Sequence, residues 1–237
     1  MLRVVSAMDR DINYTLTYKN VKNINLRIKF DGSVCVSAPK YIDVFRIDDF
    51  VISKGEYVLS SIEKFKKMQG FKKAPKKYVS GESFKILGKD LRLKVIISND
   101  EEVYSDGVFI YLKVCNDDFL KKQNLINKWI SEKTVEIYNE IANEVYKKFE
   151  KYGVSFPEIK IRKMSTRWGS CQPIKGVITI NSRLIEASRI CIEYVMMHEF
   201  CHFIHANHSK NFYLLLQVMM PDWKYRKNIL ESSIYFY

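Results

Sequence analysis

The sequence has few cysteines, and no two of them form a C-x-x-C pair. The five cysteines are scattered along 237 residues. A zinc ribbon requires closely spaced cysteine pairs, and small disulfide frameworks require a higher cysteine density. The cysteine pattern therefore argues against both classes, and it suits a protein of the reducing cytoplasm.

Long apolar runs are also lacking. No segment approaches the roughly 18 consecutive apolar residues that indicate a transmembrane helix. The first residues, MLRVVS, lack the apolar core of a signal peptide. Apolar residues nevertheless make up 47% of the chain, enough for the core of one large domain or two small ones. We therefore expect a soluble cytoplasmic protein with no membrane partner.

Acidic residues are outnumbered by basic ones. The chain has 39 Lys and Arg against 27 Asp and Glu, which gives a net charge of +12. Much of the excess lies in the linker-like stretch 64–77 and in the segment 147–151. Such a charge permits an acidic or nucleic-acid partner. Lysine runs are more often solvated surface, however, and no recognisable nucleic-acid motif accompanies them, so the charge identifies no partner.

Histidine is confined to one segment, because all four histidines lie within residues 198–208. His198 and His202 belong to an H-E-x-x-H motif, whose spacing places both on one face of a helix, where they can share a metal ion. The preceding segment 192–197 is mostly apolar, so that helix can be buried. Glu199 can lie beside the ion as a general base for a water whose pKa falls from about 15.7 towards about 7. The motif therefore predicts a zinc hydrolase site.

Two histidines compete to be the third ligand. His205 would lie about two turns along the helix from His198, too far along the axis to converge on the same ion. His208 would point away if the helix continued, so the helix must end before it. Asn207 suits a left-handed helix terminator. We therefore expect His208 to be the third ligand, and His205 to lie beside the site or to be exposed.

The rest of the chain mixes strands and helices. The Asp31–Gly32 turn predicts a hairpin that joins 26–30 to 34–36, and Gly55 is the point at which a helix over 43–69 can divide. A connector is expected at 70–77, and Gly153 is expected to close a long helix. The further expected elements are strands at 14–18, 84–86, 91–97, 108–114, 158–161 and 177–180, and helices at 117–151, 209–218 and 223–230.

Several motifs follow one another in the second half. They are T-R-W-G-S-C at 166–171, I-x-x-N-x-R-L-I at 178–185, H-E-x-x-H at 198–202, N-H-S-x-x-F at 207–212 and P-D at 221–222. This succession closely resembles the YgjP-type metal-dependent hydrolases, which are zincin-like predicted peptidases similar to SprT-like proteases in their metal core. The resemblance is specific over about residues 120–235 and looser in the first hundred. It implies ligation of Zn²⁺ by His198, His202 and His208, with Glu199 as the base.

The expected succession of strands and helices, together with the family resemblance, predicts an α+β fold. A β-rich region over 1–115 is expected to serve as scaffold or substrate-binding module. A helical, zincin-like metallopeptidase core with a small sheet is expected over 116–237. By analogy with zincin-like proteases, residues 177–181 are the candidate edge strand that pairs with an extended peptide.

Three further residues are candidates for transition-state or substrate contacts. Arg167 lies in the T-R-W-G-S-C motif, which by resemblance forms a loop near the site. Its side chain can stabilise an oxyanion, bind a carboxylate or phosphate, or form a structural salt bridge. Tyr213 and Tyr225 are two of fifteen tyrosines and follow the histidine segment.

The leading hypothesis is a zinc metallopeptidase that acts on a peptide or protein substrate of unknown identity. A second hypothesis keeps the metal and makes the protein a phosphohydrolase that acts on nucleotides. A third is a basic nucleic-acid-associated protein with a structural zinc. A structural zinc is usually enclosed by four protein ligands, often including cysteine, and the H-E-x-x-H pattern disfavours that reading.

Overall fold

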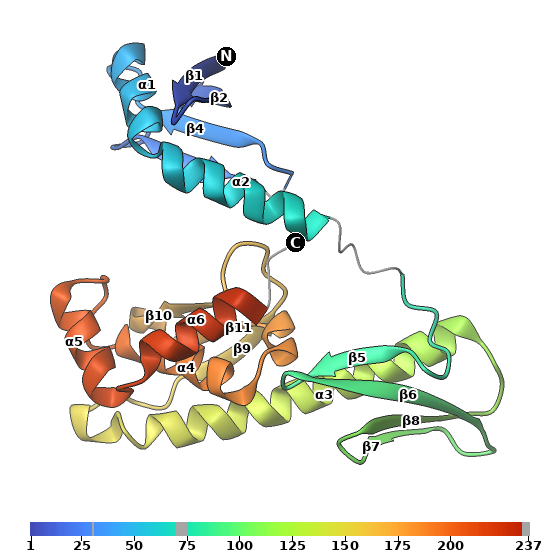
Figure 1. Cartoon of the computed structure of the whole chain (residues 1–237). Coiled ribbons are helices and arrows are strands. Elements are labelled where there is room, and N and C mark those ends of the chain that lie inside the picture. The colour runs from blue at the N-terminus through green and yellow to red at the C-terminus, as the bar shows by residue number, and fades with distance from the viewer. Residues whose placement is uncertain (30, 70–74, 234–237) are drawn as a thin grey trace. The chain divides into compact units, whose positions relative to one another are not determined.

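The computed structural model describes residues 1–29, 31–69 and 75–233 (Figure 1). It forms two compact units, Met1–Pro75 and Lys76–Tyr237. Phe30, at the end of the predicted strand 26–30, and most of the predicted connector 70–77 lie outside the described residues. Each unit has its own apolar core.

The first unit is a four-stranded sheet packed against two helices. The strands have the order β1-β2-β4-β3, and they are β1 (Leu2–Ala7), β2 (Arg10–Tyr18), β3 (Asn25–Ile28) and β4 (Val34–Ala38). The predicted hairpin is confirmed, because β3 and β4 pair antiparallel around the turn at Gly32, where φ is 82°. Alternate residues of β2 are buried, which follows from the period of two along a strand. The sequence analysis missed β1.

The predicted helix 43–69 divides in two, α1 (Val44–Ser53) and α2 (Gly55–Gln69). Asp43 caps α1, because its carboxylate accepts a hydrogen bond from the backbone N–H of Phe45. A Cβ atom on Gly55 would lie 2.6 Å from the Cβ of Ala7 in β1. Gly55 therefore allows α2 to begin in close contact with the sheet.

The second unit begins with another four-stranded sheet, of order β5-β6-β8-β7. Its strands are β5 (Ser83–Ile86), β6 (Lys89–Ile97), β7 (Glu102–Ser105) and β8 (Phe109–Val114). One face of the sheet shares a core with the long helix α3 (Phe119–Tyr146). The domain boundary expected after residue 115 therefore differs from the observed division, which follows Pro75. The sheet belongs with α3 because its buried side chains, among them Leu93 and Leu112, pack in the same core as Ile126.

The remaining elements of this unit are a three-stranded sheet and three helices. They are β9 (Glu158–Arg162), β10 (Gly169–Gln172), β11 (Val177–Asn181), α4 (Arg189–Cys201), α5 (Lys210–Met219) and α6 (Trp223–Ser233), with short 3-10 turns at Glu150–Tyr152, Pro173–Lys175 and Ser182–Glu186. The strand order is β10-β11-β9. In Figure 1, α4 lies beside this sheet, and it contacts β10 and β11; α6 packs against α4.

The prediction that residues 177–181 form a free edge is wrong. They form β11, which pairs with β9 on one side and with β10 on the other. The edge strands of this sheet are β9 and β10, and β10 was not predicted from the sequence. A four-residue strand that includes glycine and serine has little β-propensity, and it forms because β11 supplies the backbone partner.

The α+β fold class is confirmed. Across the described residues, six α-helices combine with three sheets, each of which contains both parallel and antiparallel pairs. None of the described helices combines the length and apolar character needed to cross a membrane.

We expect Gly55→Ala to destabilise the first unit. Glycine to alanine in a helix usually stabilises by up to about 1 kcal/mol, but the added methyl group would overlap the Cβ of Ala7. The net change in the free energy of unfolding should be a loss of about 1–3 kcal/mol, measured by urea denaturation. Ser60→Ala, at an exposed position of the same helix, should change it by less than about 0.5 kcal/mol. Equal or greater stability of Gly55→Ala would contradict the close packing.

Candidate metal centre

The metal centre begins on α4, which ends earlier than the sequence predicts. The expected terminator was Asn207, but the last helical residue is Cys201, and Asn207 does not adopt the left-handed conformation. The chain leaves the helix through a tight turn, in which the N–H of His202 donates to the Glu199 carbonyl at 3.2 Å and the N–H of Ile204 to the Cys201 carbonyl at 3.1 Å. These short-range hydrogen bonds satisfy the last carbonyl groups of α4.

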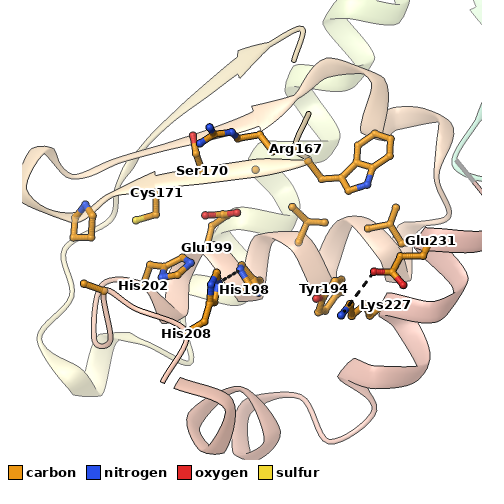
Figure 2. Close-up of a pocket in the computed structure, with 16 residues that line it drawn as sticks. Arg167, Ser170, Cys171, Tyr194, His198, Glu199, His202, His208, Lys227 and Glu231 are labelled. Carbon is orange, nitrogen blue, oxygen red and sulfur yellow. Dashed lines mark hydrogen bonds and ion pairs between the residues drawn. The ribbon is translucent and has the colours of Figure 1, made fainter. Parts of the chain in front are cut away.

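The early turn brings three imidazole rings together. Ligand atoms of His198, His202 and His208 all lie within 4.8 Å of one another. The Nε2 atoms of His198 and His208 are 2.9 Å apart (Figure 2). The side chain of His205 is not part of this group, but its backbone carbonyl lies 3.2 Å from Nδ1 of His202. A hydrogen bond there leaves Nε2 of His202 for an ion.

A buried phenylalanine supports all three rings. The ring of Phe212, on α5, is fully buried, and its centroid lies 4.9, 4.7 and 4.8 Å from those of His198, His202 and His208. Ser209 precedes α5, and its hydroxyl accepts a hydrogen bond from the Phe212 N–H at 3.4 Å. The N-H-S-x-x-F motif thus supplies a candidate ligand, a helix cap and the packing surface behind the three imidazoles.

The environment favours neutral imidazoles, which is the form that binds a metal. Burial, together with the neighbouring His202 and His208, lowers the pKa of His198 to about 3. Burial also lowers the pKa of His202. Among the described residues, Nδ1 of His198 is buried without a hydrogen-bond partner. Three imidazoles that face one another fit a first-row divalent ion.

Glu199 lies in the same cleft and packs against a glycine of the edge strand. The residue is buried, with an exposed fraction of 5%. A Cβ atom on Gly169 would lie 2.5 Å from Oε1 of Glu199 and 2.9 Å from Cδ, so any larger residue there would displace the carboxylate. Burial raises the pKa of Glu199 to about 8, and the positive charge of Arg167 acts in the opposite direction.

The loop that carries Arg167 is held by a buried amide. Asn181, at the end of β11, is completely buried, and its Nδ2 donates to the carbonyls of Met164 at 2.8 Å and Arg167 at 3.0 Å. Its Oδ1 accepts from the N–H of Arg183 at 3.2 Å. Asn181 therefore fixes the loop to the central strand. The sequence places it in a motif but does not reveal this role, because its partners are backbone carbonyls remote in sequence.

The three clustered histidines, His198, His202 and His208, line a cleft of about 580 Å³ together with Glu199. Sequence reasoning missed three polar residues of its wall. Tyr194 precedes His198 by one helical turn and could have been found from that spacing. Lys227 and Glu231 come from α6 and pair at 3.7 Å (Figure 2). The full lining is Arg167, Trp168, Gly169, Ser170, Cys171, Pro173, Tyr194, Val195, His198, Glu199, His202, Ala206, His208, Lys227, Leu230 and Glu231.

Of the three residues that the sequence suggested as transition-state or substrate contacts, the structure places one in the cleft. Arg167 lines the cleft, whereas Tyr213 and Tyr225 are not among the lining residues. The ring of Tyr213 stacks 5.6 Å from that of Trp223 and lies 6.1 Å from the ring of His208. Tyr225 is 63% exposed. The cleft therefore provides no support for a substrate contact by either tyrosine.

Comparison with known proteins agrees with the geometry. Residues 22–233 match the family described as YgjP-like, metallopeptidase domain. No curated protein matches the chain. Two solved structures with partial similarity are the metallopeptidase zymogens abylysin of Pyrococcus abyssi and jannalysin of Methanocaldococcus jannaschii. Their identities are 16% and 19% and their TM-scores 0.36 and 0.35; each alignment covers 41% of this chain, and 94% and 90% of those chains. Because the family match spans most of the sequence, the chain belongs to the YgjP-like metallopeptidase family.

Proposed function

We propose that the protein is a zinc-dependent peptidase, in which His198, His202 and His208 hold the ion and Glu199 is the general base. The observation that carries this proposal is the convergence of three imidazoles beside a buried carboxylate in one cleft. Three protein ligands leave a coordination position open for water or substrate, as catalytic zinc sites require.

A zinc ion held there would polarise a peptide carbonyl and lower the pKa of water. The carboxylate of Glu199 then accepts the proton of the attacking water and delivers it to the leaving amine. Burial makes this carboxylate a stronger base than a solvated one, since it raises the pKa to about 8. Packing against Gly169 fixes the position of the carboxylate.

The free edge of β10 is the proposed binding site for the substrate backbone. Gly169, Ser170 and Cys171 of β10 line the cleft, and β10 pairs with β11 on one side only. An extended peptide can add to such an edge through backbone hydrogen bonds. Arg167 lies on the same wall and is exposed, so its guanidinium can bind a developing oxyanion or a substrate carboxylate. The substrate is proposed to be a peptide or protein of the cytoplasm.

A second candidate function is metal-dependent hydrolysis of nucleotides. The presence of two cations in the cleft, Arg167 and Lys227, favours it, because phosphates bind such groups. Lys227 is partly neutralised by Glu231, and this weakens the case. Assays of the same preparation with a mixed peptide library and with nucleoside triphosphates separate the two functions. The structural-zinc alternative is disfavoured because, within the described residues, the ligand group has three side chains and opens onto a cleft.

We expect Glu199→Gln to bind metal normally and to lose peptidase turnover. The amide keeps the size of the side chain but cannot accept the proton, and general-base catalysis typically contributes about 10²–10⁴-fold. The measurements are metal content and kcat/KM on a cleaved peptide. A variant with full activity would exclude Glu199 as the base.

Gly169→Ala should lower turnover by about 100-fold, since a displacement of about 1 Å at a reacting group can have this effect. The three atoms nearest to the added methyl group all belong to Glu199, which is not one of the proposed metal ligands, so metal content should not change. Gln172→Ala, at an exposed position on the same strand, is the matched control and should retain activity. Equal activity of both variants would show that the contact between Gly169 and Glu199 does not position the base.

A further inference from the structure

The sheet β5-β6-β8-β7 has one face that does not pack on α3. Leu93, Ile110 and Leu112 point into the core shared with α3, and the residues that alternate with them point the other way. We call these alternating residues the open face. Its central members are Arg92, Lys94, Tyr104, Phe109, Tyr111 and Lys113. None of them lines the metal cleft.

Three aromatic rings lie together on the open face. Tyr104 of β7 is directly opposite Tyr111 of β8, and their rings stack at 4.9 Å with an interplanar angle of 13°. Phe109 precedes Tyr111 by two residues on the same strand, with ring centroids 6.1 Å apart. Tyr104 is 38% exposed, and Phe109 and Tyr111 are half-buried. The open face thus carries a row of three partly exposed aromatic rings.

Cations alternate with these rings. In the parallel pairing of β6 with β8, Arg92 lies beside Phe109 and Lys94 beside Tyr111. The ammonium group of Lys94 lies 3.6 Å from the Phe109 ring centroid and 5.2 Å from that of Tyr111. Lys113 lies 5.3 Å from the ring of Tyr104. Lys and Arg beside aromatic faces can bind phosphate while the rings bind bases.

The charge of the open face favours an anionic occupant. Lys113 pairs with Glu102 at 2.8 Å, whereas the described residues show no carboxylate partner for Arg92 or Lys94. Both of these side chains are exposed, and the whole chain carries a net charge of +12. Cross-strand aromatic pairs also stabilise sheets, but that role does not require unpaired cations beside exposed rings.

We propose that the open face binds single-stranded RNA. Bases would stack on Tyr104, Tyr111 and Phe109, and phosphates would pair with Arg92 and Lys94, which is how exposed faces of small sheets bind unpaired RNA. RNA suits the face better than DNA because the exposed Glu102 carboxylate, which pairs with Lys113, can also accept a hydrogen bond from a ribose 2′-hydroxyl. This site is separate from the metal cleft and does not depend on the peptidase proposal.

The test is fluorescence anisotropy of the full chain with a labelled single-stranded RNA of mixed sequence, about 12 nucleotides long, over a range of salt concentrations. The double variant Tyr104→Leu/Phe109→Leu removes two rings and keeps apolar bulk; it should weaken binding at least about tenfold and leave the salt dependence unchanged. Lys94→Gln should reduce the slope of log K against log salt by about 0.7, the value for one lost phosphate contact.

Two control variants lie outside the open face. Tyr152→Leu removes an exposed ring and Lys128→Gln removes an exposed cation of α3, and both should bind RNA like the wild type. Circular dichroism establishes that each variant is folded. Absence of RNA binding by the wild type, unchanged binding by both open-face variants, or equal affinity for duplex RNA would overturn the proposal. Equal affinity for DNA of the same sequence would overturn the assignment to RNA.

Discussion

The metal centre depends on the place where α4 ends. His198 and Glu199 are helical, and the tight turn after Cys201 orients Nδ1 of His202 toward the carbonyl of His205. The same turn allows the chain to bring His208 back, with its Nε2 2.9 Å from that of His198. A helix that continued through His208 would direct that side chain away from the other two rings. The fully buried Phe212 then packs against all three rings.

The position of the Glu199 carboxylate, the proposed base, depends equally on the sheet. Glu199 contacts the backbone of β10 at Gly169, and β10 is held by β11. Asn181, at the end of β11, anchors the loop that carries Arg167. Three separate sequence motifs, at 166–171, 178–185 and 198–202, therefore determine the position and surroundings of a single carboxylate. The ion pair between Arg226 of α6 and Glu193 of α4 joins these two helices. Residues of α6 line the opposite wall of the cleft.

Local sequence signals predicted the parts of this structure that local forces determine. The spacing of His198 and His202 follows from helical periodicity, and the hairpin at Gly32 follows from turn chemistry. The edge strand β10 was not predictable in this way, because its pairing depends on a partner later in the chain. The observed division after Pro75 differs from the boundary expected after residue 115 for a similar reason: the sheet β5–β8 joins the second unit through core contacts with α3, which strand patterns do not reveal.

The most direct test of the metal centre is the metal content of the purified protein beside that of His208→Ala and His205→Ala. We expect about one zinc ion per chain in the wild type and a large loss in His208→Ala. His205→Ala should keep its metal, because His205 contacts His202 through its backbone carbonyl, which alanine also has. Stoichiometric metal in His208→Ala, or loss of metal in His205→Ala alone, would contradict the three-histidine centre.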